Sequence, residues 1–351
     1  MTSPATTTTP FPEDLARALP KAELHVHLEG SVDPATMLAL AARHGVTPPA
    51  PDEAGIRDWL RFDGFPSFLD RYFRVCDLLR DGDDFATLAA AYLAHAHGQG
   101  AVHVEFHVSS SFHIVERGAD WTEVLEGIVA GCERAEADLG ISSLLIPDLS
   151  PHLGAAAAHE ALDVVLATLH PRIAAIGMGG PADNWRTEDF GAAFRRAREA
   201  GLHTVSHAGE HGPAWEVRHA LEEFGAERIQ HGIGAMSDPD VVALLVEEGV
   251  ACDVCPGSNV ALAAVDSLAV HPLPAMLDAG CHRHPRVRRS TVLRHRPAQR
   301  VPPRGTCARS TRTACATSPS IPWWRASPPP SGSRSGWPAD GADGQRIGSG
   351  P

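Results

Sequence analysis

Short apolar runs rich in Val, Ile and His alternate along the chain with longer amphipathic stretches. The runs have the length and composition of buried strands, and we place seven strands at Glu23–Leu28, Val102–Val108, Ser142–Pro147, Ile173–Met178, His203–His207, Arg228–His231 and Val250–Cys255. The stretches between them have helical spacing, and they include Trp121–Leu139, Ala155–Leu169, Glu188–Ala200, Trp215–Phe224 and Pro239–Glu248. Strands that alternate with helices predict a parallel sheet and an α/β fold.

One long excursion interrupts this alternation between the first strand and the second. Residues Asp33–Gln99 are mostly helical in pattern, so we expect a helical insertion that caps the end of the first strand. Seven β/α units in about 250 residues predict a (β/α)₈ TIM-type barrel whose eighth strand is missing or disrupted. A doubly wound open sheet is the structural alternative, but no G-x-G-x-x-G follows a strand to support it.

Charge divides the 351 residues into two unlike parts. The formal net charge of −13 combines a net of −24 over residues 1–280 with a net of +11 over residues 281–351, which hold 13 Arg and two Asp. The second part also has 11 Pro, no Phe and no Tyr, and it lacks the period of a helix or a strand. We therefore expect a disordered segment at 1–18, a barrel domain at 19–280, and a disordered basic tail at 281–351.

Cysteine use and the N-terminus bear on the compartment. The seven Cys are odd in number and lack the regular spacing of a disulfide framework, which indicates a reducing environment. The Thr-rich N-terminus has no basic start followed by an apolar segment, and no run approaches the roughly 20 apolar residues of a membrane span. These features predict a soluble, cytoplasmic protein without a membrane partner.

Two histidines lie in the first predicted strand with spacing i, i+2. His25 and His27 therefore point to the same side of the sheet, which in a barrel is the lumen. Neutral imidazoles near the C-terminal end of a barrel strand form half of a zinc site, because barrel active sites lie at that end. A pair of buried, hydrogen-bonded histidines is the alternative for this motif taken alone.

Two further motifs place candidate metal-binding and acid–base residues at the same end of the predicted barrel. In Ser206-His207-Ala208-Gly209-Glu210, His207 closes the fifth strand as a third candidate ligand, and Glu210 follows it. Burial near a metal would raise the pKa of Glu210 enough to hold a proton at neutral pH, although a carboxylate at a helix N-terminus is the alternative. His231 ends the sixth strand and suits a base or a group that holds a metal-bound hydroxide.

The segments PKAELHVHLEGS, SHAGE, RIQHGI and CPGSN, in this order, resemble the adenosine deaminase family of zinc amidohydrolases from about Leu19 to Gly280. The resemblance implies one Zn²⁺ per subunit held by His25, His27 and His207. It also implies that Glu210 protonates purine N1 and that His231 orients the attacking hydroxide, which the metal generates by lowering the pKa of water.

The resemblance carries expectations about the substrate as well. Gly180 corresponds to a glycine that hydrogen-bonds the purine, Glu29 to a position that contacts the sugar 5′-hydroxyl and is often Asp, and His27 is expected beside the substrate. Adenosine or deoxyadenosine, converted to inosine or deoxyinosine and ammonia, is the expected substrate. Adenine and an aminodeoxyfutalosine-type nucleoside are alternatives within the family, and the oligomeric state stays open.

The cytidine type of zinc deaminase offers a weaker match. His27-Leu28-Glu29 and Cys252-Asp253-Val254-Cys255 imitate its H-x-E and C-x-x-C motifs, but the cysteine pair lacks the preceding Pro and leaves SHAGE and QHG unexplained. We interpret both cysteines as core residues. The other histidines are expected to pack or to lie on the surface, and they include His95, His97, His103, His107 and His113.

The family's eighth strand carries Ser/Thr-Asp-Asp-Pro, whose first Asp completes the zinc sphere, and the chain lacks it at the expected place. From Cys281 the chain reads CHRHPRVRRSTVLRHRP. Codons can be chosen for this peptide that, when read one base later, encode ATVTLGSDDPPFFGTDL. The two Asp codons of this second frame begin within the codons of Arg288 and Arg289. Our hypothesis is a single-base insertion or deletion near codon 281, biological or from sequencing. The alternative of another class is an inactive remnant whose basic tail contacts nucleic acid.

Overall fold

The computed structural model describes residues 13–62, 64–180 and 189–281. The expected disorder of residues 1–12 and of the basic tail beyond Cys281 lies outside these described residues. Residues Glu13–Ala18, which we assigned to the disordered N-terminal segment, instead form helix α1. The apolar side chain of Ala16 on this helix is buried, so the first strand is preceded by a short packed helix.

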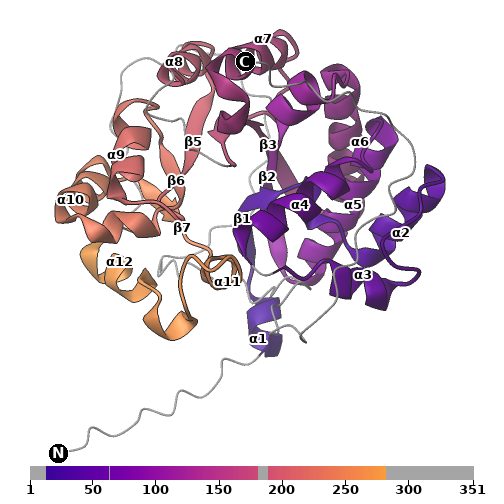
Figure 1. Cartoon of the computed structure of the whole chain (residues 1–351), viewed down its shortest axis with the longest axis horizontal. Helices are drawn as coiled ribbons and strands as arrows, with labels where there is room; N and C mark the ends of the chain where they lie inside the picture. Colours follow the sequence, from indigo (N-terminus) through magenta and orange to yellow (C-terminus); the bar gives the residue numbers. More distant parts are fainter. Residues whose placement is uncertain (1–12, 63, 181–188, 282–351) are drawn as a thin grey trace, which may run out of the picture.

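In the described residues the sheet contains seven parallel strands in the order of the sequence, β1 to β7, arranged in a ring with helices outside (Figure 1). The strands are β1 Lys21–His27, β2 Ala101–Val108, β3 Ser142–Leu149, β4 Ala175–Met178, β5 His203–Ala208, β6 Arg228–His231 and β7 Ala251–Asp253. Parallel strands in sequential order are the topology of a (β/α)₈ barrel, whereas a doubly wound sheet reverses its strand order part-way. The predicted incomplete TIM-type barrel is therefore confirmed.

Amphipathic helices cover the outside of the strands. They are α6 Trp121–Leu139, α7 Gly154–Ala167, α8 Gly191–Glu199, α9 Ala214–Glu222, α10 Pro239–Glu248, α11 Pro256–Ala261 and α12 Leu273–Ala279. In α6, Asp120 caps the first turn by accepting the Thr122 N–H, and Gly140 ends the helix with a left-handed conformation. Phe194 of α8 stacks on Phe224, with ring centroids 4.6 Å apart, in the layer between helices and sheet.

The long insertion between β1 and β2 is helical, as the sequence pattern predicts. Its helices are α2 Pro34–Arg43, α3 Glu53–Trp59, α4 Phe65–Cys76 and α5 Gly82–Gly98. The Tyr72 hydroxyl of α4 reaches the Glu29 carboxylate just beyond β1, so the insertion packs over the end of that strand. Short helical turns lie at several strand ends: η1 Glu29–Ser31, η2 Phe112–Glu116, η3 Pro151–Leu153, η4 Ile233–Ser237 and η5 Leu268–Val270.

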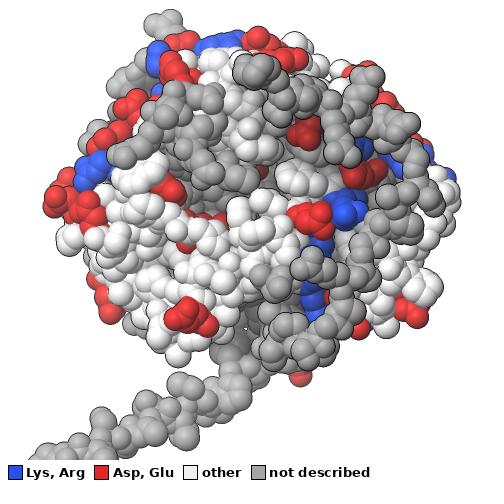
Figure 2. Space-filling view, viewed as in Figure 1, with Lys and Arg blue, Asp and Glu red and all other residues white. Residues whose placement is uncertain are grey.

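The barrel is open between its first and last strands. Within the described ranges, β1 pairs only with β2 and β7 only with β6, so each strand has one edge without a sheet neighbour. Asp and Glu side chains are spread over one face of the molecule more widely than Lys and Arg (Figure 2). No helix among the described residues has both the length and the apolar composition needed to cross a membrane.

Candidate metal and catalytic site

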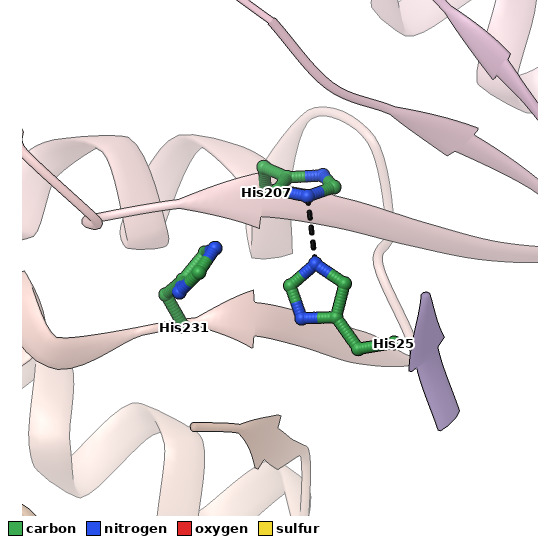
Figure 3. Close-up of side chains that lie close together, drawn as sticks. All are labelled: His25, His207 and His231. Atoms are coloured by element: carbon green, nitrogen blue, oxygen red, sulfur yellow. Dashed lines mark hydrogen bonds between the residues drawn. The ribbon is translucent and has the colours of Figure 1, made fainter. Parts of the chain in front are cut away.

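Three imidazoles from two strands meet at the C-terminal end of the barrel. His25 and His27 of β1 alternate with Val26, which is buried on the opposite side of the strand. Their Nε2 atoms lie 2.8 and 2.9 Å from Nε2 of His207 on β5. The three predicted metal ligands are thus brought together, and Figure 3 shows His25 and His207 facing each other with His231 beside them.

The protonation state of His207 follows from its backbone surroundings. Its Nδ1–H donates to the Met178 carbonyl oxygen at 2.7 Å, which leaves the lone pair on Nε2, the atom that faces His25 and His27. Gly179 makes this approach possible, because a Cβ atom there would lie 3.1 Å from the His207 ring. The glycine-rich end of β4 therefore positions the imidazole of β5 as a ligand.

The imidazoles are neutral, which is the form that binds metal. Burial, followed by the mutual proximity of the rings, lowers the pKa of His25 and of His207 well below the ordinary value. Burial and the neighbouring His107 likewise lower the pKa of His27 to about 3. Three converging neutral imidazoles suit Zn²⁺, so this donor set fits the metal that the sequence predicts.

A buried carboxylate lies behind His27. Asp148 Oδ2 is 3.7 Å from His27 Nδ1, while His107 Nδ1 hydrogen-bonds Asp148 Oδ1 at 2.9 Å. A carboxylate next to the outer nitrogen of a ligating histidine orients that ring and raises its basicity. Asp148 belongs to none of the motifs that predicted the site, and His107 was expected to be a packing or surface residue. Asp148 interrupts an apolar strand at an inward position, a signal that could have identified it.

Glu210 and His231 face each other beside the imidazole cluster. Glu210 Oε1 lies 3.3 Å from His231 Nε2. Burial, and then the charge of Glu216, raise the pKa of Glu210 to about 7, whereas burial lowers the pKa of His231 to about 3. At neutral pH the pair can therefore present a carboxylic acid and a neutral imidazole, which are the forms expected of an acid and an orienting group.

The backbone at His231 turns the side chain away from the strand. His231 ends β6 with φ +63°, a conformation that non-glycine residues adopt rarely and that is frequent at functional sites. One ring nitrogen of His231 and one each of His25 and His207 lie within 4.8 Å of one another. By distance alone, His231 therefore belongs to the same cluster as the predicted metal ligands.

Glu29 lies in a separate set of contacts just past β1. Its Oε1 accepts hydrogen bonds from the Ser109 N–H at 2.8 Å and from His113 Nε2 at 2.9 Å, and its Oε2 accepts one from the Tyr72 hydroxyl at 3.0 Å. Burial raises the pKa of Glu29, but the hydrogen bond and charge of His113, together with the backbone N–H groups of Glu29 and Ser109, outweigh it and the pKa is lowered. Both oxygens of this fully buried carboxylate accept hydrogen bonds within the protein, and the expected contact with a sugar hydroxyl stays a prediction.

Gly180 lies two residues beyond the end of β4, at the same end of the barrel. Its φ of +109° requires glycine, and a Cβ atom there would lie 3.5 Å from His152 Nδ1. The structure thus places Gly180 at the barrel mouth, and its contact with a purine stays a prediction.

The comparisons with known proteins match this geometry. A family model described as adenosine deaminase matches residues 20–283. The chain belongs to the adenosine deaminase family. An adenine deaminase of Streptomyces coelicolor is 41% identical over 269 residues, which cover 77% of this chain and 78% of that protein. An adenine deaminase of Rhodospirillum rubrum is 38% identical, covering 75% and 78% of the two chains.

Solved structures in the family resemble this fold as well. The crystal structure of an adenine deaminase from Arthrobacter aurescens is 40% identical, has a TM-score of 0.69, and covers 74% of this chain and 79% of that chain. An amidohydrolase from Burkholderia ambifaria with bound Zn is 29% identical with a TM-score of 0.70, and the coverage is 79% and 78%. Family membership and the imidazole cluster together indicate a metal-dependent hydrolase of the amidohydrolase type.

Proposed function

We propose that this protein catalyses the zinc-dependent hydrolytic deamination of an adenine-type purine, with free adenine as the substrate and hypoxanthine and ammonia as the products. The observation that carries the proposal is the pair formed by Glu210 and His231, 3.3 Å apart beside three neutral imidazoles. This arrangement supplies an acid, an orienting hydrogen-bond group and a metal site at the mouth of one barrel.

His25, His27 and His207 would hold the zinc ion. When bound, Zn²⁺ supplies the Lewis acidity that makes water nucleophilic near neutral pH. Glu210, whose pKa burial raises to about 7, delivers its proton to ring nitrogen N1. This protonation makes the amino-bearing carbon electrophilic, so that the oxygen of water adds there while His231 orients it. Of the two protons that this water loses, one goes to the amino group, which leaves as ammonia as its bond to carbon breaks, and the other restores the acid form of Glu210.

The choice of adenine over adenosine revises the expectation from the sequence. The named relatives from S. coelicolor, R. rubrum and A. aurescens are adenine deaminases. In this chain Glu29 is fully buried and its oxygens accept hydrogen bonds from Ser109, His113 and Tyr72, which does not favour a contact between this carboxylate and a sugar hydroxyl. A free base needs no such contact, so the internal engagement of Glu29 supports a base rather than a nucleoside.

Ammonia release from adenine, adenosine, deoxyadenosine and an aminodeoxyfutalosine-type nucleoside tests the proposal. The assay uses the chain as written and a frame-corrected chain, both supplied with Zn²⁺. We expect adenine to have the highest kcat/KM, and Glu210→Gln to lower kcat by about 10²- to 10⁴-fold. Faster turnover of any nucleoside than of adenine would contradict the assignment of the base.

The nucleic-acid alternative depends on residues that the structure does not describe. Among the described residues, acidic side chains predominate on the face drawn in Figure 2, which does not favour a polyanion. Salt-dependent binding carried by residues 281–351 alone would support that alternative.

A further inference from the structure

A chain of hydrogen bonds connects His231 to the backbone of α12 through two buried side chains. The Leu273 N–H donates to His271 Nδ1 at 3.0 Å, and His271 Nε2 lies 3.1 Å from Asn259 Oδ1. Asn259 Nδ2 in turn lies 3.1 Å from His231 Nδ1. Asn259 has no exposed surface and His271 is 6% exposed, so water cannot readily substitute for either partner.

The direction of every bond in this chain follows from its first donor. A backbone N–H can only donate, so Nδ1 of His271 accepts, and its single proton lies on Nε2. Burial lowers the pKa of His271, which keeps this ring neutral. His271 then donates to Oδ1 of Asn259, whose Nδ2–H faces His231. The reversed amide would force His271 to accept at both nitrogens, which an imidazole carrying a proton cannot do.

This direction determines the tautomer of His231. Because its Nδ1 accepts the hydrogen bond from Asn259, the proton of the neutral ring lies on Nε2, the nitrogen that faces Glu210 Oε1. An Nε2 atom that carries a proton has no lone pair for a metal ion. His231 can therefore donate a hydrogen bond from Nε2 at the site, even though one of its ring nitrogens lies within 4.8 Å of ring nitrogens of His25 and His207.

His207 provides the internal contrast. Its Nδ1–H donates to the Met178 carbonyl oxygen, so its Nε2 is a lone-pair donor to a metal. Two histidines of one cluster thus receive opposite tautomers, because one faces an acceptor and the other faces a donor. We propose that Asn259 and His271 are positioning residues that keep His231 as an Nε2–H donor to the attacking oxygen and outside the metal coordination sphere. The catalytic part of this inference rests on the proposed deaminase function.

The tautomer can be measured without turnover. In the full chain labelled with ¹⁵N-histidine and freed of metal, two-bond ¹H–¹⁵N spectra distinguish protonated from unprotonated ring nitrogens, and His231→Gln identifies the His231 signals. We expect the Nε2–H form for His231. A signal pattern with the proton on Nδ1 would overturn the inference whether or not the protein deaminates adenine.

Asn259→Asp tests the cause of the tautomer, because it replaces the donor by an acceptor of the same shape. We expect His231 Nδ1 to become protonated in this variant, whereas Ser258→Ala, one residue earlier on α11, leaves the His231 signals unchanged. An unchanged tautomer in folded Asn259→Asp would show that Asn259 does not determine it. Circular dichroism and thermal unfolding establish that each variant is folded.

His271 provides a second pair of variants if Asn259→Asp fails to fold. His271→Phe removes the donor that anchors the amide of Asn259, so we expect a mixture of His231 tautomers. His271→Gln keeps a donor at the same reach and should restore the Nε2–H form. Identical spectra for the Phe and Gln variants would contradict the role of His271.

Kinetics separate this inference from the proposed function. With adenine as substrate, Asn259→Asp should lower kcat by about 10- to 100-fold with little change in KM, because His231 acts on the attacking oxygen and not on the purine. An unchanged kcat would overturn the catalytic part of the inference. If the unmodified protein proves inactive toward every purine, the proposed function fails, while the measured tautomer still decides the hydrogen-bond assignment.

Discussion

At the scale of single residues, the site depends on giving chemically similar groups different properties. Glu210 is buried near another carboxylate and has a pKa raised to about 7, whereas Glu29 accepts three hydrogen bonds and has a lowered pKa. One carboxyl group can therefore hold a proton at neutral pH and the other stays ionised. Burial is common to both, so the difference in pKa comes from the neighbours: the charge of Glu216 beside Glu210, and the hydrogen-bond donors around Glu29.

Glu216→Gln tests this explanation of the Glu210 pKa. Removing the charge of Glu216 removes the repulsion that helps to raise the pKa of Glu210, so that pKa should fall toward its ordinary value. The amide oxygen of Gln can still accept the Gly209 N–H, which Glu216 accepts at 2.9 Å. The infrared carboxyl band of Glu210, followed against pH in metal-free protein and assigned with Glu210→Gln, gives the measurement.

Glu222→Gln is the matched control for this charge change. It removes an exposed carboxylate from the same helix, α9, that forms an ion pair with Arg218 at 3.4 Å. The titration of Glu210 should not move in this variant. A Glu210 midpoint that is the same in Glu216→Gln and in the unmodified protein would rule out Glu216 as a cause. In the active enzyme, activity should decline as the pH rises through about 7, because the acid form of Glu210 is lost.

At the scale of elements, catalytic groups are placed where strands end and the backbone changes direction. His231 and Gly232 both have positive φ, which turns the chain from β6 into η4 and leaves the His231 side chain at the barrel mouth. The end of β4 at Gly179 approaches the His207 ring closely. Small residues at these points let neighbouring strands approach one another where the ligands converge.

Gly232→Ala should show the cost of altering such a turn. Its φ is +70°, and an added Cβ atom would lie 2.6 Å from Cys252 Sγ of β7, so we expect a loss of about 1–3 kcal/mol in the free energy of unfolding. Urea denaturation measures this loss. Gly257→Ala is the control, because Gly257 lies in α11 with a negative φ and no atom within 4 Å of an added Cβ, and stability should stay the same or rise slightly.

At the scale of the whole molecule, the described residues form seven strands of the barrel, but the first and the last of these strands do not pair with each other. β1 and β7 each lack a neighbour on one side within residues 13–281, and β1 carries two of the predicted metal ligands. Unpaired edges invite association with other chains, and a ligand strand that is held on one side only is less rigidly placed. An eighth strand at this opening would pair with both free edges and would hold β1 on both sides.

Restoring the frame near codon 281 tests the hypothesis that the eighth strand was lost to an insertion or deletion. The corrected chain, with Ser-Asp-Asp-Pro in its new strand, should be more soluble, bind Zn²⁺ more tightly and deaminate adenine faster than the chain as written. Metal analysis, sedimentation and ammonia release measure these three properties. Full activity in the uncorrected chain, or gene codons incompatible with the second frame, would contradict the hypothesis.

The periodic apolar pattern was sufficient to predict the seven strands, the helical insertion and the class of barrel, because burial on both faces leaves a direct imprint on the sequence. Strand ends were less well determined: the seventh was predicted to run to Cys255, and it ends at Asp253. The motifs at or near the strand ends also predicted candidate site residues whose side chains the structure brings close together, and their roles stay predictions: His25, His27, His207, Glu210 and His231.

The sequence by itself thus determined the barrel class and predicted which residues carry the chemistry. The tertiary structure decided their states. Tyr72, Ser109 and His113 hydrogen-bond Glu29. Asn259 hydrogen-bonds His231 and is itself bonded to His271. The Met178 carbonyl oxygen accepts a hydrogen bond from His207. Tautomers and pKa values depend on which donor or acceptor lies within about 3 Å, and such partners come from distant positions whose spacing carries no period.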